Sequence, residues 1–224
     1  MEPNKIIKII VDEMKIEKNV NDTSAFETLV TTIISQNTND KNTEKAVKLL
    51  KKEIGLDIES ILLAKREKII ECLKPAGLYN IKVPRIIELA KRIKHELGDE
   101  RKLDLMSDEE IIDFLSKIKG IGPKTIDIFL AFKRGRDIIP VDTHVSRVSK
   151  RLGIADKKDG YFEIRKKLEE IVPKGERLKT HFALITFGRR VCTAKDPKCT
   201  MCPVKDNCPS SKQFLSYQRK VETV

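Results

Sequence analysis

Four cysteines lie close together in the last part of this 224-residue sequence, at Cys192, Cys199, Cys202 and Cys208. Four thiolates at this spacing can hold either a tetrahedral zinc ion or a [4Fe–4S] cube. The spacing alone does not separate these two metal groups, because both accept four thiolates. Disulfides are disfavoured, since disulfide scaffolds are usually small and secreted. The fifth cysteine, Cys72, is expected to be a small buried apolar residue.

The loop that carries the four cysteines is also basic. Lys195 and Lys198 lie between the first two cysteines, and prolines along the loop restrict its conformations. Such a loop can present ammonium groups to phosphates, which dominate the affinity of proteins for nucleic acids.

A glycine turn between two helical patterns is the second candidate site. Gly120 and Gly122 precede Lys124 and Thr125. Two glycines one residue apart let the backbone turn tightly and approach a ligand closely. The helix that follows points its free N–H groups and positive dipole end outward, which makes a phosphate site. By itself, such a turn is more often an ordinary connection between two helices than a ligand site.

Lys124 and Asp142, eighteen residues apart, are a pair that can support covalent catalysis. A lysine amine can attack C1′ of a nucleotide, displace the base and form a Schiff base, which enables β-elimination of the 3′ phosphate. A nearby carboxylate stabilises the positive charge that develops on the sugar. The amine must be partly neutral, which a helix N-terminus in a partly desolvated groove favours. Taken singly, Lys124 is one of 45 basic residues and Asp142 is an ordinary N-cap.

Helical periodicity runs through nearly the whole sequence and must position these groups. No segment shows sustained strand-like alternation, so we expect an all-α fold. Capping boxes at Ser24–Glu27 and Ser107–Glu110 mark two helix starts, the polar stretch 35–40 ends the first of these helices, and Pro84 suits the first turn of another. The other expected helices are 4–14, 41–54, 58–64, 67–73, 123–133, 142–152, 160–172 and 177–190, and the sequence beyond them is expected to be irregular.

The composition narrows the class of protein. The formal net charge is +11 and the pI is about 9.4, which favours a polyanionic partner. The 35% of charged residues also suits a lysine- and glutamate-rich surface of thermophile type. No apolar run is long enough to cross a membrane, and residues 1–18 lack a signal-peptide layout. We therefore expect a soluble intracellular protein, and the charge alone favours a nucleic-acid partner only modestly.

These motifs together resemble the endonuclease III family of helix–hairpin–helix DNA glycosylases. The six–two–five cysteine spacing is similar to that family's [4Fe–4S] loop, and it follows a helix ending Phe187–Gly188–Arg189–Arg190. The turn 118–125 resembles the family hairpin, and Val141–Asp142–Thr143–His144 resembles the segment that follows it. The resemblance spans roughly residues 24–208, and it implies a monomer that works in the cytoplasm, on the chromosome. It implies a [4Fe–4S] cluster that holds the loop gripping DNA and is not the site of base excision.

The same resemblance implies a domain organisation and two catalytic roles. One helical part is a six-helix barrel at residues 23–134 that carries the hairpin. The other joins residues 1–22 to residues 135–224 and holds the cluster, with a DNA groove between the two parts. Lys124 is implied to be the nucleophile, and Asp142 is implied to be its carboxylate partner on the facing side of the groove.

The resemblance also implies which residues contact double-stranded DNA. Gln36 and Asn37 in one loop, and Leu78 and Tyr79 in another, match family loops that enter the duplex and fill the space left by an extruded base. Read from the residues alone, the first pair would merely end a helix and Leu78 would be core. The other DNA-contacting positions implied are Asp40, Gly120, Gly122, Thr125, His144, Lys195 and Lys198, while Arg147 is implied to pack near the cluster.

Three positions limit the resemblance to the family. Lys119 replaces the more usual proline of the hairpin, and Asp196 lies where the family tends to be basic. Thr32 stands where the adenine-specific branch needs a glutamate, which argues against that branch.

The implied activity is excision of oxidised pyrimidines such as thymine glycol from damaged duplex DNA, followed by nicking at the abasic site. The enzymatic alternative is a monofunctional glycosylase that removes thymine or uracil opposite guanine. Lys124 disfavours it, because monofunctional relatives usually carry another residue there, such as serine or tyrosine. The alternative from a different class is a non-catalytic helical DNA-binding protein with a structural zinc, which would have no use for the Lys124–Asp142 pair.

Overall fold

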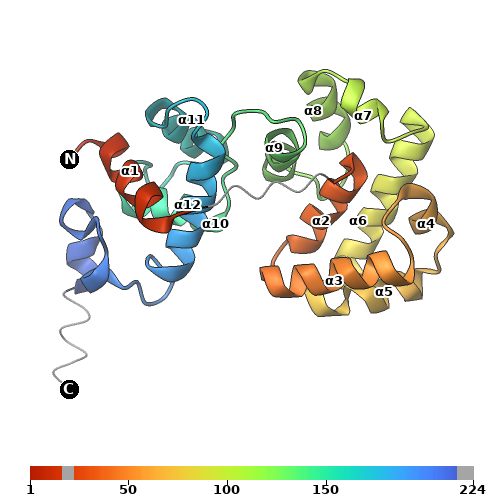
Figure 1. Cartoon of the computed structure of the whole chain (residues 1–224), viewed down its shortest axis with the longest axis horizontal. Coiled ribbons are helices and arrows are strands. Elements are labelled where there is room, and N and C mark those ends of the chain that lie inside the picture. The colour runs from red at the N-terminus through yellow and green to blue at the C-terminus, as the bar shows by residue number, and fades with distance from the viewer. Residues whose placement is uncertain (17–22, 216–224) are drawn as a thin grey trace. The chain divides into compact units, whose positions relative to one another are not determined.

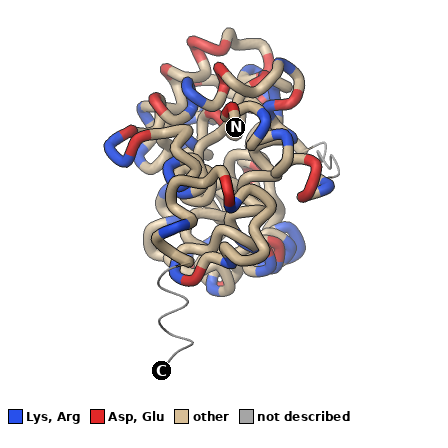
Figure 2. Tube along the Cα trace, turned by 90° about the vertical axis from the view of Figure 1, so that its left-hand side faces the viewer, with Lys and Arg blue, Asp and Glu red and all other residues tan. Residues whose placement is uncertain are grey.

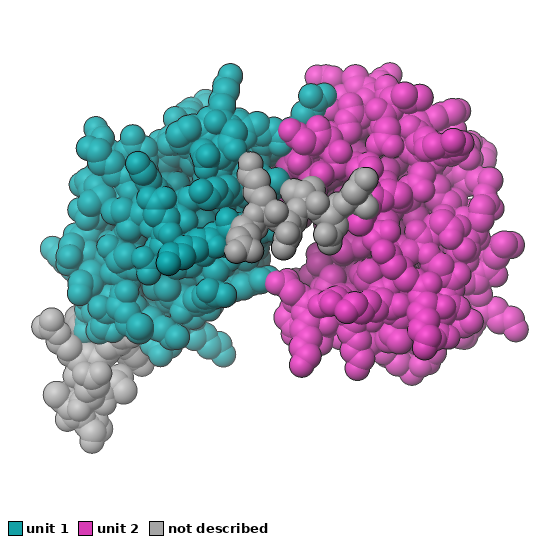
Figure 3. Space-filling model, in the orientation of Figure 1, with its two compact units in different colours: residues 1–20, 136–224 teal, residues 21–135 magenta. Residues whose placement is uncertain are grey.

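The computed structural model describes residues 1–16 and 23–215, and the chain divides into two compact units (Figure 3). The split unit combines residues 1–20 with residues 136–224, and the continuous unit is residues 21–135. Both are helical, and the described ranges contain no strand, so the expectation of an all-α fold is confirmed. No helix in these ranges has the length and apolar character needed to cross a membrane.

The continuous unit carries the glycine turn and most of the predicted DNA-contacting positions. Its helices are α2 (Ala25–Ser35), α3 (Asp40–Glu53), α4 (Ile58–Leu63), α5 (Arg66–Leu73), the 3-10 turn η1 (Lys74–Ala76), α6 (Tyr79–Arg92), the π-helical turn η2 (Ile93–Leu97), α7 (Lys102–Leu105), α8 (Asp108–Ser116) and α9 (Pro123–Phe132). Helix α2 is central to the unit, because it packs against α3, α6 and α9. Its apolar face, which includes Phe26, Leu29 and Ile33, is completely buried. Each such side chain contributes about 1.5–3 kcal/mol relative to an exposed one.

The split unit is built from both ends of the described chain. Its helices are α1 (Pro3–Met14), α10 (Thr143–Arg151), α11 (Tyr161–Ile171) and α12 (Arg177–Arg190), followed by the 3-10 turns η3 (Cys199–Met201) and η4 (Lys205–Asn207). Helices α1 and α10 both pack against α12, and α1 lies beside α12 in Figure 1. Ile7 and Ile10 of α1 share one core with Leu184 and Phe187 of α12. That core is the scaffold from which Asp142 and the cysteine loop project.

Local capping explains several of the helix starts. Ser107 and Glu110 form the complete reciprocal capping box that the sequence predicts at the start of α8. At α2, the Ser24 hydroxyl accepts from the Glu27 N–H at 3.1 Å, while the Glu27 carboxylate lies 2.5 Å from the ammonium of Lys51. Both helices therefore begin where their caps predict.

Four predictions about local structure are wrong. Pro84 lies inside α6 and not in its first turn, because the helix begins at Tyr79. Tyr79 is therefore helical and does not belong to a loop. Asp40 is the first residue of α3, whose cap is Asn39, and so it too lies in a helix. The residues after α12 are less irregular than predicted, since they contain η3, η4 and a helical segment at 211–215.

Basic and acidic residues are both scattered over the trace in Figure 2. Several of the exposed charges are paired within one helix, for example Lys48 with Glu44. Exposed pairs of this kind contribute little to stability.

Candidate nucleic-acid interface and cysteine centre

The glycine turn lies directly before α9. Gly120 has a φ of +92°, a left-handed conformation that glycine adopts without strain. Gly122 is the N-cap of α9, and it is followed by Pro123, which suits a first helical position because it lacks an N–H. The described structure therefore has the helix–turn–helix geometry that the sequence predicts, with the N-terminal end of α9 available to an anion.

Lys124 is the second residue of α9 and is half-buried. Its ammonium forms no hydrogen bond or ion pair with any described residue. The neighbouring Thr125 is buried, and its N–H donates to the Gly122 carbonyl at 2.9 Å. The turn therefore fixes the backbone on which Lys124 stands and leaves the amine free.

The amide of Gln36 is hydrogen-bonded inside the continuous unit. Its Nε2 donates to the Gly120 carbonyl at 3.3 Å and lies 3.4 Å from the Thr125 hydroxyl. Its Oε1 accepts from Nη1 of Arg85 at 2.8 Å. Gln36 thus links the end of α2 to the glycine turn. Its neighbour Asn37 is exposed, with a left-handed φ of 54°.

Leu78 is the second exposed residue with an unusual backbone. It is the N-cap of α6, with a φ of 49°, and its side chain is 47% exposed. A left-handed leucine costs about 1–2 kcal/mol and persists only where the surroundings enforce it. Tyr79 and Asp40 differ in accessibility, because Tyr79 is half-buried whereas Asp40 is exposed.

Asp142 is the N-cap of α10, as its position before the predicted helix indicates. Its Oδ1 accepts from the Val145 N–H at 2.8 Å, and the residue is half-buried beside a hollow that Ser146 and Tyr161 also line. This hydrogen bond occupies one oxygen of the carboxylate. Asp142 belongs to the split unit and Lys124 to the continuous unit, so the pairing of the two remains a prediction.

His144 and Arg147 connect α10 to the helix before the cysteine loop. The Nη2 of Arg147 lies 3.0 Å from Nδ1 of His144 and donates to the Gly188 carbonyl at 2.8 Å, while its Nε donates to the Cys192 carbonyl at 3.1 Å. A Cβ on Gly188 would lie 3.0 Å from the His144 Cβ, so α10 and α12 approach each other closely at this glycine. His144 is therefore oriented by Arg147 and is half-buried.

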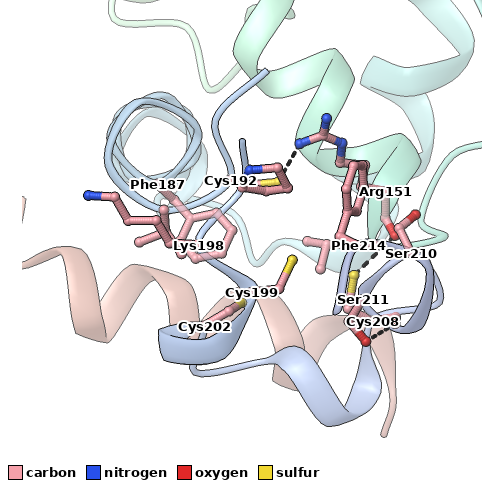
Figure 4. Close-up of a pocket in the computed structure, with 13 residues that line it drawn as sticks. Arg151, Phe187, Cys192, Lys198, Cys199, Cys202, Cys208, Ser210, Ser211 and Phe214 are labelled. Atoms are coloured by element: carbon pink, nitrogen blue, oxygen red, sulfur yellow. Dashed lines mark hydrogen bonds between the residues drawn. The ribbon is translucent and has the colours of Figure 1, made fainter. Parts of the chain in front are cut away.

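The four cysteines line one apolar hollow (Figure 4). Burial raises the pKa of Cys202 to about 11, and burial also raises the pKa values of Cys199 and Cys208. Without a positive ion these thiols therefore stay protonated at neutral pH, and a bound metal would have to displace the protons. Lys195 and Lys198 are exposed, and in Figure 4 the Lys198 side chain points away from the sulfurs.

The arrangement of the thiols bears on which metal group they can hold. Within residues 1–16 and 23–215, no three His, Cys, Asp or Glu side chains converge closely enough to hold a single metal ion. The four cysteines are spread around the hollow instead (Figure 4). Both a [4Fe–4S] cluster and a zinc ion can be bound by four thiolates, so the choice between the two groups stays a prediction.

Three basic side chains have positions in the structure that the sequence pattern does not predict. Arg151 donates to the loop carbonyls of Thr193 and Ala194, at 2.6 and 2.8 Å. Lys82 is buried and donates hydrogen bonds to the carbonyls of Ile34 and Ala76. Arg85 donates a hydrogen bond to the side chain of Gln36. Helical periodicity places Arg151 and Arg85 only on helix surfaces among many other basic residues, so nothing in the sequence singles them out.

Comparisons with known proteins place this geometry in context. Residues 30–174 match the HhH-GPD superfamily of base excision DNA repair proteins. Endonuclease III of Bacillus subtilis is 36% identical over 183 residues, covering 82% of this chain and 80% of that protein. Endonuclease III of Thermotoga maritima is 32% identical over 191 residues, covering 85% of each. A solved non-covalent endonuclease III–DNA complex has a TM-score of 0.82 at 29% identity, covering 96% of this chain and 100% of that one.

Proposed function

Since this chain belongs to the HhH-GPD superfamily of base excision DNA repair proteins and is a DNA glycosylase, we propose that it also nicks abasic strands through Lys124. The observation that carries the proposal is the position of Lys124. It follows the Gly120–Gly122 turn, and its ammonium is free of any partner in the described part of the chain. A second similar structure, with a TM-score of 0.80, is a trapped endonuclease III–DNA covalent intermediate, and it supports a covalent mechanism.

In the proposed reaction, the neutral Lys124 amine attacks C1′ of the target nucleotide. The base leaves with the electrons of the glycosidic bond, and it takes up a proton from solvent or a neighbouring acid. Loss of the amine proton and opening of the sugar give a Schiff base between Nζ and C1′. Removal of a C2′ proton then expels the 3′ phosphate, which nicks the strand.

Asp142 is proposed to act on the charge that develops during this reaction. Its Oδ1 caps α10, and its second oxygen is proposed to face the sugar. A carboxylate there stabilises the oxocarbenium-like sugar and takes the proton that the lysine loses. His144, held by Arg147, is proposed to orient DNA near this carboxylate.

The DNA is proposed to be held by three segments of the continuous unit and one loop of the split unit. The N–H groups after Gly122 bind a phosphate. Asn37 and Leu78, both exposed and both left-handed, are the residues proposed to fill the space left by the extruded base. Gln36 has its amide engaged inside the protein, so its proposed part is to support Asn37 and the turn. Lys195 and Lys198 contact phosphates from the cysteine loop.

The four cysteines are proposed to hold a [4Fe–4S] cluster. The four side chains line one hollow, and their spacing resembles that of the family's cluster loop. When bound, the cluster supplies a cross-link that fixes the loop carrying Lys195 and Lys198. Replacing Cys202 with serine is expected to abolish the brown colour and the bound iron, whereas Cys72→Ser, at a buried site outside the loop, should retain both. A colourless wild-type protein with one zinc per chain would contradict this proposal.

The proposed substrates are oxidised pyrimidines in duplex DNA, as the resemblance of the sequence motifs to the endonuclease III family implies. The test is nicking of a duplex with one abasic site by the wild type, Lys124→Gln and Asp142→Asn, with borohydride added to trap the Schiff base. Lys119→Gln, which changes an exposed lysine of the same turn, is the matched control. We expect the wild type and the control to nick and to be trapped, and Lys124→Gln to bind without nicking. Binding without nicking or trapping by the wild type would favour a monofunctional glycosylase.

A further inference from the structure

Helix α6 carries a buried lysine that bonds two separate segments of the continuous unit. Lys82 is 1% exposed, and its Nζ donates to the carbonyls of Ile34 at 2.7 Å and Ala76 at 2.9 Å. Burial lowers the pKa of this lysine, because an ammonium removed from water loses its hydration. A buried amine is retained only where acceptors compensate for that loss.

Both carbonyls that accept from Lys82 lie at the ends of helices, where backbone carbonyls need hydrogen-bond donors. Ile34 is in the last turn of α2, where the carbonyls have no helical partner and carry the negative end of the dipole. Ala76 ends η1, two residues before Leu78. The ammonium therefore bonds one carbonyl three residues before Asn37 and another two residues before Leu78, and both of these residues have a left-handed backbone.

Arg85, one turn further along α6, reaches a third segment. Its Nη1 donates to Oε1 of Gln36 at 2.8 Å, and Gln36 in turn donates to the Gly120 carbonyl. A Cβ built on Gly120 would lie 2.1 Å from Nε of Arg85, so the guanidinium fills the space beside that glycine. Arg85 thus packs against the turn that precedes Lys124.

The geometry points to Lys82 and Arg85 as positioning residues: one face of α6 holds the Gln36–Asn37 loop, the Gly77–Leu78 turn and the Gly120–Gly122 turn in one fixed arrangement. This inference rests on the proposed function, because it assigns the purpose of that arrangement to the engagement of damaged DNA. The three segments are far apart in sequence, and each is short. Without a common attachment each would move independently, and positional error at such a site is costly in affinity and rate.

The first test is hydrogen exchange of the free protein, which does not depend on activity. Lys82→Met and Arg85→Met keep an unbranched apolar stem and remove the charged group. Lys91→Met, at an exposed site on the same helix, is the matched control. We expect Lys82→Met to speed amide exchange in segments 35–38 and 76–79, and Arg85→Met to speed it in segments 35–38 and 118–122. Unchanged exchange in these segments would overturn the inference.

The second test separates positioning from general stability. Affinity is measured for a duplex containing a tetrahydrofuran abasic-site analogue and for the same duplex undamaged. In Lys82→Met and in Arg85→Met, loss of the hydrogen bonds from the charged group is expected to weaken binding of the analogue about tenfold. Binding of the undamaged duplex, which depends mainly on surface charge, should stay at the wild-type value. An equal loss for both duplexes would contradict a positioning role.

Two further variants keep the result interpretable. If Lys82→Met does not fold, Arg85→Met, at a half-buried site, carries the test. Arg85→Lys keeps a cation without the planar fork and should restore part of the lost affinity for the analogue. Failure of the proposed lyase would show differently, as a wild type that does not nick, while the exchange experiment would still decide the role of α6.

Discussion

Arg151 and Phe214 form a cation–π pair, with the guanidinium carbon 4.6 Å from the centre of the ring. The same guanidinium donates to the carbonyls of Thr193 and Ala194, and the backbone carbonyl of Arg151 accepts from the Cys208 thiol at 3.3 Å. One residue of α10 therefore contacts the cysteine loop near its beginning and near its end.

Removing this side chain is expected to loosen the loop. Arg151→Met should lower the free energy of unfolding by about 2–4 kcal/mol, since hydrogen bonds from a charged group contribute about 1.5–3 kcal/mol each. Urea unfolding and the rate of iron loss from the protein measure the effect. Lys150→Met, next to it in α10, is the control because its ammonium bonds only the exposed carbonyl of Lys157. If Arg151→Met were as stable as the wild type, the cysteine loop would not depend on Arg151 for its stability.

Asp142 offers a way to separate capping from catalysis. Asn caps a helix about as well as Asp, so Asp142→Asn should keep the stability of the wild type while losing the negative charge. We expect its nicking rate to fall by about 100- to 1000-fold. Asp142→Ala loses the cap as well and should be less stable by about 1 kcal/mol. Single-turnover nicking and thermal unfolding give the two readouts, and full activity in Asp142→Asn would leave the residue only its capping role.

Leu78 combines an unfavourable backbone with an exposed apolar side chain. In Leu78→Gly, relief of the left-handed strain is offset by the greater chain entropy of glycine, so the stability should change by less than about 1 kcal/mol. The affinity for the abasic-site analogue should still fall about tenfold, because the apolar side chain that would be buried in DNA is gone. Leu105→Ala, at a leucine that is 84% exposed in the same unit, should change neither quantity. Unaltered affinity in Leu78→Gly would remove Leu78 from the interface.

Asp57 predicts a dependence of stability on pH. The Ser60 hydroxyl and the Ser60 N–H both donate to this carboxylate and hold its pKa below 3.8. Because the folded value is the lower one, the contribution is fully present above about pH 4 and is lost as the pH falls through the folded value. The unfolding free energy of wild type minus that of Asp57→Asn should therefore shrink on acidification, by at most about 1 kcal/mol for this exposed cap. Urea unfolding at a series of pH values checks this, with Asp104→Asn as an exposed control, and a pH-independent difference would contradict it.

Features determined by neighbouring residues could be predicted from the sequence. The Ser107 capping box, the Asp142 cap and the bounds of α12 are all local, and the structure has them as expected. The start of α6 could not be predicted, because α6 begins at a left-handed leucine and contains Pro84. Propensity disfavours both features, and only tertiary contacts stabilise them.

The candidate site divides in the same way. Spacing alone identified the four cysteines that share one hollow and the turn that precedes Lys124. The internal bonding of Gln36 depends on Arg85 and Gly120, which are 49 and 84 residues away in the chain. Nothing local distinguishes Lys82 from the other basic residues, because its burial is a property of the packed unit.

The contact between α1 and α12 has a consequence for synthesis of the protein. The continuous unit can complete its core as soon as its own residues have left the ribosome, but α1 has to wait for α12. At about 5–20 residues per second, the stretch between Met14 and Arg177 leaves α1 without its partner for on the order of ten to thirty seconds. During that time Ile6, Ile7 and Ile10 lack the α12 surface that later buries them. A chaperone that binds short apolar helices would find its substrate in α1, residues Pro3–Met14, during that interval.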